Sequence, residues 1–198
     1  LAGPGARAHL ASLTVSKLPQ PGRTGLLYFA DDRGCIVTEM TCLPFSDEDV
    51  GVITAAVAQS HDADILRKGL PEGVTLEDWT DRIHCFIVTG PKARDLLAGI
   101  AEADLTLPWL SVQYFAKVAG RDVALVRVSF AGELGWEIHC DRDDAAQIYD
   151  ALLAAGAKPF GMKALNALHI EKGYRAWKGD LSTDYSLLEG GLERFIDW

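Results

Sequence analysis

The stretch VALVRVSFAGELGWEIHC, residues 123–140, decides how the second half of this chain is interpreted. Two apolar runs flank a glycine-bounded break at 131–135, a pattern that is typical of an antiparallel hairpin with a loop of several residues. The break carries one carboxylate, Glu133, between two glycines. Because Asn-Gly and Asp-Gly are the usual pairs in short hairpin turns, the glutamate invites a functional explanation.

A second hairpin and a shared helix start indicate two related halves. The run LLYFADDRGCIVTEMTCL, residues 26–43, also consists of two apolar stretches around a polar break. Each hairpin follows a segment that begins with Gly-Pro, at 3–13 and at 90–100. Glycine is acceptable at a helix N-cap and proline suits the first helical position, so both segments predict helices.

The segments around these hairpins extend the parallel. Helices are expected again after the hairpins, at 61–68 and 143–155, and a strand is expected at 83–89 before the second Gly-Pro helix. The first copy has no such strand, which suggests a piece of a longer protein. We therefore predict a duplicated domain whose first half is 1–80 and whose second half is 81–198.

The C-terminal part predicts one more helix and then an unusual loop. Residues 162–172 fit a helix that ends at Gly173. The run 174–180 combines tyrosine, arginine, tryptophan and aspartate, and such loops often border a ligand. A tryptophan that caps the edge of a core explains the run equally well.

Composition excludes several classes of protein. A chain of 198 residues with 48% hydrophobic and 24% charged residues is long enough to bury a sizeable core. A net charge of −9 with scattered basic residues argues against a nucleic-acid partner. No long apolar run or basic-then-apolar leader is present, so we expect neither a membrane span nor a secretory signal.

The cysteines and histidines show no ligand or catalytic pattern. Four cysteines without a C-x-x-C pair are interpreted as free thiols in a reducing compartment, and we expect a cytoplasmic location and no metal. His84 and His139 fall in strand-like runs and are interpreted as structural. Among acidic groups beside aromatic residues, Glu133 and Glu39 are the main candidates. A carboxylate accepts two parallel N–H donors and so matches the amidine-like edge of a flat heterocycle, although Glu133 alone is more simply a solvated turn residue.

Several ordered motifs resemble the folate-binding family of the glycine cleavage system T protein. They are VTGPKARDLL (88–97), SFAGELGWEIHC (129–140), YDALLAAG (149–156), FGMKALNALHIEKGYRAWKGDL (160–181) and LLEGGL (187–192), with a weaker match in the first half. The chain is most similar to the T-protein-like half of dimethylglycine and sarcosine dehydrogenases. The resemblance implies an α+β fold of two related antiparallel-sheet units with packed helices, without the C-terminal barrel that family members carry.

The resemblance also implies roles for individual residues. Glu133 would hydrogen-bond the pterin ring of tetrahydrofolate, and Tyr174, Trp177 and His169 would join it in binding the cofactor. Glu39 would lie near the folate nitrogens that accept the one-carbon unit, where the family usually has aspartate, and it is the candidate catalytic residue.

Three further positions depart from the family pattern. Leu26 stands where tyrosine is common, Cys35 replaces a glycine, and His169 replaces an arginine. The arginine would be a permanent cation with a bidentate fork, which histidine does not supply. The second half of the expected site therefore matches the family better than the first.

The implied activity is tetrahydrofolate-dependent one-carbon transfer, which takes methylene from a small methylamine-type donor and gives 5,10-methylenetetrahydrofolate. In the dehydrogenase-like relatives FAD lies on a preceding flavin domain, so such a domain is a possible partner in the full-length chain. Two alternatives stay open: a binding or structural module that has lost transfer chemistry, and a demethylase that moves a methyl group directly to tetrahydrofolate.

Overall fold

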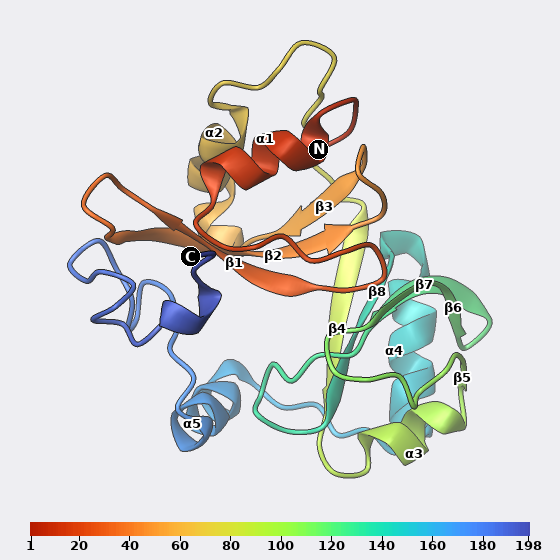
Figure 1. Ribbon diagram of the computed structural model, residues 1–198. Coiled ribbons are helices and arrows are strands. Elements are labelled where there is room, and N and C mark those ends of the chain that lie inside the picture. The colour runs from red at the N-terminus through yellow and green to blue at the C-terminus, as the bar shows by residue number, and fades with distance from the viewer. The chain divides into compact units, whose positions relative to one another are not determined.

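The computed structural model describes residues 1–198, and these form two compact units (Figure 1). The first unit comprises 1–77 together with 175–198, and the second comprises 78–174. No helix combines the length and the apolar character needed to cross a membrane. The elements are α1 (Ala6–Leu13), β1 (Gly25–Ala30), β2 (Ile36–Pro44), β3 (Val50–Ile53), η1 (Ala56–Ala58), α2 (Gln59–Arg67), β4 (Ile83–Thr89), α3 (Ala93–Ala98), β5 (Ala101–Glu102), β6 (Val112–Val118), β7 (Arg121–Val126), β8 (Gly135–Asp141), η2 (Arg142–Asp144), α4 (Ala145–Ala154), α5 (Met162–Lys172) and η3 (Glu193–Phe195).

The first unit is built on an antiparallel sheet in the order β1-β2-β3. Strand β2 is the central strand, and its residues alternate between two apolar layers. Leu27 and Met40 face one layer, where they pack with Leu10 of α1 and Leu66 of α2. Both helices therefore serve to cover one face of the sheet.

The C-terminal segment covers the other face of the same sheet. Leu181, Leu187 and Leu192 pack against Tyr28 and Ile36 of the hairpin. The segment is also tied to the hairpin by an isolated antiparallel bridge and by a bond from the Trp177 indole to a β2 carbonyl. An apolar second face of a sheet needs a cover, and this segment provides it.

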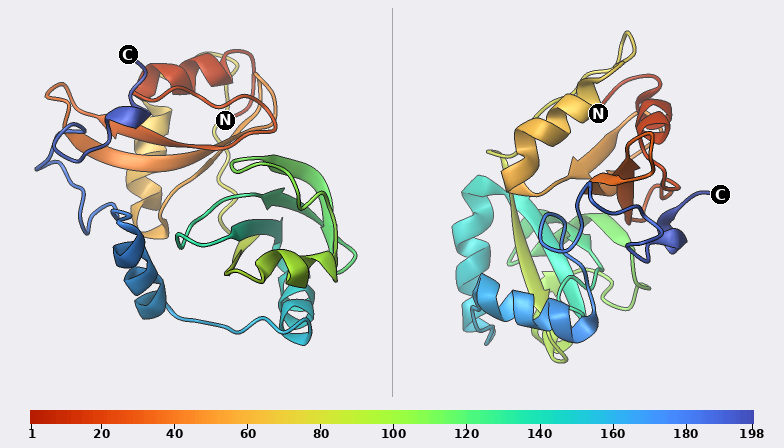
Figure 2. Two further views of the ribbon diagram at one scale, coloured as in Figure 1. Left: turned by 60° about the horizontal axis from the view of Figure 1, so that its bottom comes forward. Right: turned by 90° about the vertical axis from the view of Figure 1, so that its left-hand side faces the viewer.

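The second unit has a five-stranded antiparallel sheet in the order β4-β8-β7-β6-β5. Helices α3 and α4 pack on one face (Figure 2). Leu97 of α3 and Ile148 of α4 meet Trp136 and Ile138 of β8, all fully or almost fully buried. Both sheets are open, with β1 and β3 at the edges of one and β4 and β5 at the edges of the other.

Most of the local predictions are confirmed. The strand expected at 83–89 is β4, and both predicted hairpins exist, as β1–β2 and β7–β8. The Gly-Pro helices begin three residues later than their glycines, because Gly3 and Gly90 both have positive φ, near +126° and +125°, and form a turn first. The α+β fold with two antiparallel sheets is confirmed. The predicted duplication into halves 1–80 and 81–198 concerns ancestry and stays a prediction. The compact units have different bounds, because residues 175–198 pack with the first unit.

Candidate functional site

The loop that carries Glu133 joins β7 to β8 and is longer than the sequence pattern indicated. Because β7 ends at Val126 and β8 begins at Gly135, the loop spans 127–134 rather than a short break. The Arg127 guanidinium donates to the Gly135 carbonyl at 3.0 Å and lies 4.7 Å from the centre of the Trp136 ring. The Ser129 hydroxyl donates to the Glu133 carbonyl at 2.8 Å. These bonds close the loop on itself.

The glycines on both sides of Glu133 allow the chain to approach itself. Gly132 has φ of +82°, and a Cβ on it would lie 2.7 Å from the side chain of Lys172 on α5. A Cβ on Gly135 would lie 3.0 Å from the carbonyl oxygen of Val128. Packing within the second unit therefore requires a glycine at both positions.

The Glu133 side chain is exposed, and its carboxylate makes no hydrogen bond or ion pair within the chain. Only its backbone carbonyl is engaged, by Ser129. Both carboxylate oxygens are therefore available to accept N–H groups from a ligand, while the backbone that carries them is tied down on each side.

His169 and Tyr174 lie in the same unit, on α5 and just after it. The His169 ring is 5.2 Å from the Phe130 ring in an edge-on arrangement and 6.1 Å from the Tyr174 ring. Its Nε2 atom is buried without a hydrogen-bond partner. The structure thus brings Tyr174 and His169 together and links them, through Phe130, to the loop of Glu133.

Glu39 lies in the middle of β2, directly opposite Tyr28 on β1. The Tyr28 hydroxyl and the backbone N–H of Trp177 both hydrogen-bond to its carboxylate. Its Oε2 atom is buried without a hydrogen-bond partner. Burial raises the pKa of the Glu39 carboxyl, and the two hydrogen bonds offset part of that rise.

Tyr28 is a residue that sequence analysis missed. It is almost fully buried and its ring lies 5.0 Å from that of Phe195. Burial, followed by the neighbouring Glu39 carboxylate, raises the pKa of its phenol, so the hydroxyl stays a donor. The register of the predicted hairpin was the signal that could have paired it with Glu39.

Trp177 also lies in the first unit, beside Glu39. Its indole Nε1 donates to the Val37 carbonyl at 3.1 Å, and the Lys178 ammonium lies 5.1 Å from the ring centre. The His61 ring is 6.2 Å away, and its Nδ1 is 2.8 Å from Oδ1 of the fully buried Asp62. Trp177 therefore caps a core edge, and its backbone N–H is a partner of Glu39, whereas its expected role beside a ligand stays a prediction.

Each unit by itself presents a carboxylate that fits an N–H donor of the kind that a reduced pterin carries along its planar ring. The Glu133 carboxylate has no internal partner, and Oε2 of Glu39 is an orphaned buried acceptor. Buried acceptors usually have partners, so Oε2 of Glu39 fits an added N–H donor. The donor that each carboxylate needs is the kind that the pterin edge provides.

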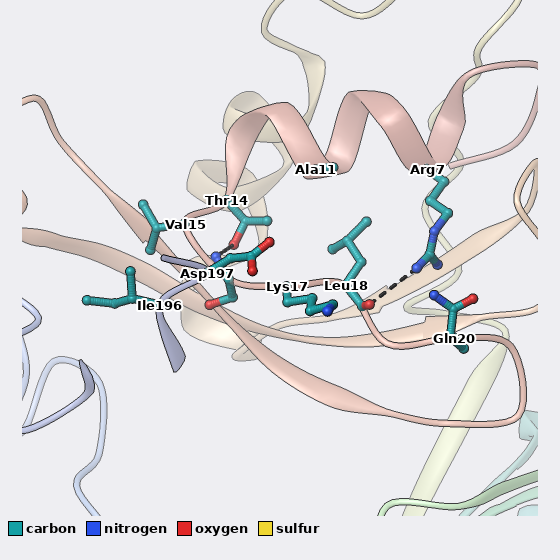
Figure 3. A pocket seen from close by; sticks show the side chains of 10 residues that line it. Arg7, Ala11, Thr14, Val15, Lys17, Leu18, Gln20, Ile196 and Asp197 are labelled. Carbon is teal, nitrogen blue, oxygen red and sulfur yellow. Dashed lines mark hydrogen bonds between the residues drawn. The ribbon is translucent and has the colours of Figure 1, made fainter. Parts of the chain in front are cut away.

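A pocket of about 500 Å³ lies elsewhere in the first unit, between the segment after α1 and the end of the chain (Figure 3). Arg7, Lys17 and Asp197 are among the residues that line it. The Arg7 guanidinium donates hydrogen bonds to the Leu18 and Pro19 carbonyls, at 3.2 and 2.8 Å. Because none of the predicted site residues lines this pocket, we do not assign it to the site.

The family model of the GCVT N-terminal domain matches residues 1–198. The chain belongs to this family. The solved structure of the glycine cleavage system aminomethyltransferase T from Bartonella henselae has the same fold, with a TM-score of 0.74 at 20% identity over 94% of this chain and 51% of that one. A heterotetrameric sarcosine oxidase from Corynebacterium sp. U-96 aligns with a TM-score of 0.55 at 18% identity, over 80% and 78% of the two chains.

Curated relatives of this GCVT domain are longer proteins. Mitochondrial dimethylglycine dehydrogenase of Mus musculus is 32% identical over 197 residues, which cover 94% of this chain and 23% of the dehydrogenase. An aminomethyltransferase of Thermus thermophilus is 31% identical over 165 residues, which cover 82% of this chain and 47% of the enzyme. The chain thus spans about a quarter of the first relative and about half of the second.

Proposed function

We propose that this GCVT domain binds tetrahydrofolate and takes part in one-carbon transfer, as the folate-binding part of an enzyme that demethylates a small methylamine such as dimethylglycine or sarcosine. The observation that carries the proposal is the Glu133 carboxylate, which stands without an internal partner on a loop fixed by Arg127, Ser129 and Gly132. The match of the family model to residues 1–198 supports it.

Glu133 is proposed to receive the amino-bearing edge of the pterin. Its two oxygens accept parallel N–H donors, and a hydrogen bond to a charged acceptor contributes about 1.5–3 kcal/mol. Because the loop is already ordered, little conformational entropy is lost when the ligand arrives. Tyr174 and His169 are proposed to add to cofactor binding in this unit, and Trp177 in the first.

Glu39 is proposed to handle the proton. Tetrahydrofolate, when bound, supplies the nitrogen nucleophiles that accept the one-carbon unit. Tyr28 and the Trp177 backbone orient the Glu39 carboxyl and leave Oε2 open to take or hold a proton. Burial raises the pKa of this carboxyl toward the working pH, which favours general acid–base catalysis.

A further part of the proposal concerns the full-length protein. The curated relatives include proteins named dimethylglycine dehydrogenase and sarcosine dehydrogenase. We therefore propose that the oxidation of the methylamine, with FAD as the cofactor, belongs to a flavin domain outside the sequence described here.

A second candidate is a folate-fold module that binds or assembles without transfer chemistry. It is favoured by Glu39 in place of the usual aspartate and by His169 in place of the arginine, since both changes alter groups that position the cofactor. A glutamate is one methylene longer than aspartate, and a displacement of roughly an ångström matters for a positioned group.

The deciding experiment follows carbon transfer to tetrahydrofolate in the full-length protein. Glu39→Gln keeps the shape of the side chain but removes the proton acceptor, so we expect kcat to fall by about 100-fold with little change in the Kd for tetrahydrofolate. The exposed carboxylate of Glu102 on β5 gives the control, Glu102→Gln, which should transfer at the wild-type rate.

The outcomes separate the candidates. A wild-type protein that binds tetrahydrofolate but transfers no carbon would favour the binding module. A Glu39→Gln variant with the full rate would remove Glu39 from the chemistry. The product distinguishes methylene transfer from a demethylase that moves a methyl group directly to tetrahydrofolate. Methylene transfer gives 5,10-methylenetetrahydrofolate, whereas direct demethylation gives the 5-methyl form.

A further inference from the structure

A histidine and a buried aspartate form a hydrogen-bonded pair in the first turn of α2. Asp62 is fully buried, and its Oδ1 atom lies 2.8 Å from Nδ1 of His61. The Thr54 hydroxyl donates to the other carboxylate oxygen, Oδ2. Both oxygens of Asp62 therefore have a partner, and the position of the carboxylate is fixed from two sides.

The aspartate determines how His61 presents its ring. Because a carboxylate only accepts hydrogen bonds, the bond to Asp62 requires a proton on Nδ1. Nε2 makes no hydrogen bond within the chain, and the His61 side chain is 52% exposed whereas that of Asp62 is 1% exposed. A histidine held at Nδ1 by a buried carboxylate and open at Nε2 has the arrangement of a general acid–base.

The charges of the pair suit the transfer of a proton. Asp62 forms no ion pair with lysine or arginine, and His61 is its ionic partner. A buried carboxylate is costly unless a positive charge or hydrogen bonds compensate for it. A proton taken up at Nε2 would make an imidazolium ion, which the adjacent carboxylate stabilises.

The pair lies beside the groups proposed to carry out the transfer. The centre of the His61 ring is 6.2 Å from that of the Trp177 ring. The backbone N–H of the same tryptophan hydrogen-bonds to the Glu39 carboxylate. His61 and Glu39 therefore flank one residue, and all of these groups belong to the first unit.

The proposed transfer moves two protons. An oxidised donor in the iminium form loses both bonds between its carbon and its nitrogen, and the nitrogen keeps both electron pairs. The carbon forms one bond to each of two folate nitrogens, and the two protons released there end on the amine, which leaves as an ammonium ion. Because the single Glu39 carboxyl holds one proton at a time, a second group is needed to carry the other.

We propose that His61 is this second proton-transfer residue and that Asp62 is its positioning residue. Nε2 accepts one of the two released protons and passes it to the nitrogen of the departing amine, while Asp62 holds Nδ1 and stabilises the imidazolium. The inference rests on the proposed folate-dependent transfer and adds the group that serves the donor amine.

Replacement of the ring in the full-length protein tests this role. His61→Ala should lower kcat for carbon transfer by about 100-fold, with little change in the calorimetric Kd for tetrahydrofolate. Added imidazole should restore part of the rate, and imidazoles of different basicity should restore it to different extents, because a free base then does the work of the ring. Imidazole should leave Glu39→Gln slow, since that change opens no space for it.

Asp62→Asn tests the positioning residue. The amide keeps the shape of the side chain but not its charge, so we expect kcat to fall by about tenfold or more. Asp64→Asn is the matched control on the same helix, because its carboxylate is exposed, and this variant should transfer at the wild-type rate. Near-ultraviolet circular dichroism verifies that each variant is folded.

A readout without any ligand comes from long-range proton–nitrogen NMR spectra of the wild type. They should show the neutral His61 ring with its proton on Nδ1. A neutral ring protonated on Nε2 instead would overturn the inference.

The kinetic outcomes separate this inference from the proposed function. If the wild type transfers carbon and a folded His61→Ala variant is as fast, or is slow but unaffected by imidazole, the role of His61 is overturned and the proposed function stands. A wild type that transfers no carbon to tetrahydrofolate would overturn both.

Discussion

Each of the two hairpins of this protein carries one of the two carboxylates proposed for the site, and these two are placed in opposite ways. Glu39 lies within strand β2, is mostly buried, and is held by Tyr28 and the Trp177 backbone. Glu133 lies in the loop before β8, is exposed, and has no partner for its carboxylate. The same motif of two strands around a break thus gives one desolvated group and one open acceptor.

This difference shows that two similar hairpins can place a carboxylate for different uses. A desolvated carboxyl with a raised pKa is suited to exchanging protons, whereas an open carboxylate on a fixed loop is suited to recognition. The loop around Glu133 is fixed by packing and backbone bonds, and the carboxyl of Glu39 is fixed by its own hydrogen bonds. The predictions below test these two modes of positioning.

The largest expected effect comes from crowding the Glu133 loop with Gly132→Ala. The new Cβ meets a positive φ and the Lys172 side chain at 2.7 Å, so we expect the free energy of unfolding to fall by about 2–3 kcal/mol. Gly120→Ala is the matched control, because Gly120 has a similar φ of +74° but no neighbour within 4 Å. It should lose only about 1–2 kcal/mol in urea denaturation. Equal losses for the two variants would show that contact with α5 does not hold the loop.

A smaller effect is expected when Glu39 loses its phenol donor. Tyr28→Phe keeps the ring packed against Phe195 and removes the hydroxyl, so we expect a loss of about 1 kcal/mol in the free energy of unfolding. Tyr149→Phe on the exposed side of α4 should change stability by less than about 0.5 kcal/mol. A Tyr28→Phe variant as stable as the wild type would mean that the bond contributes nothing.

The same variant has a pH signature of definite sign. The Tyr28 bond lowers the pKa of Glu39, so its removal should raise that pKa further, as an NMR titration of the side-chain carboxyl would show. A carboxyl with a raised pKa in the folded state costs stability as pH rises from its unfolded to its folded value. Tyr28→Phe should therefore lose more stability at neutral pH than below the unfolded pKa of glutamate. An equal loss of unfolding free energy in Tyr28→Phe at both pH values would contradict a bond from Tyr28 to the ionised Glu39 carboxylate.

The sequence predicts most of the local structure, because helices, hairpins and their ends depend on residues close together in the chain. Apolar runs around polar breaks gave both hairpins, and Gly173 ends α5 in the left-handed conformation that favours glycine there. The β7–β8 loop proved longer than predicted, because Arg127 bonds to Gly135 and keeps the intervening residues out of the ladder.

The features of the fold and of the site that the sequence did not predict depend on contacts between residues far apart in the chain. The Tyr28–Glu39 pair requires the strand register, and the packing of 175–198 on the first sheet requires knowledge of which face lacks a cover. Glu133 itself was found from its glycines and the resemblance, but its lack of internal partners is visible only in the structure.

The most direct test of the central claim is a calorimetric titration of tetrahydrofolate into the wild-type protein and into Glu133→Gln and Glu102→Gln. The account predicts that the wild type and Glu102→Gln bind alike, and that Glu133→Gln binds at least about tenfold more weakly, because the amide replaces one acceptor by a donor. Binding of tetrahydrofolate by Glu133→Gln with the wild-type Kd would contradict the claim that this open carboxylate recognises the pterin.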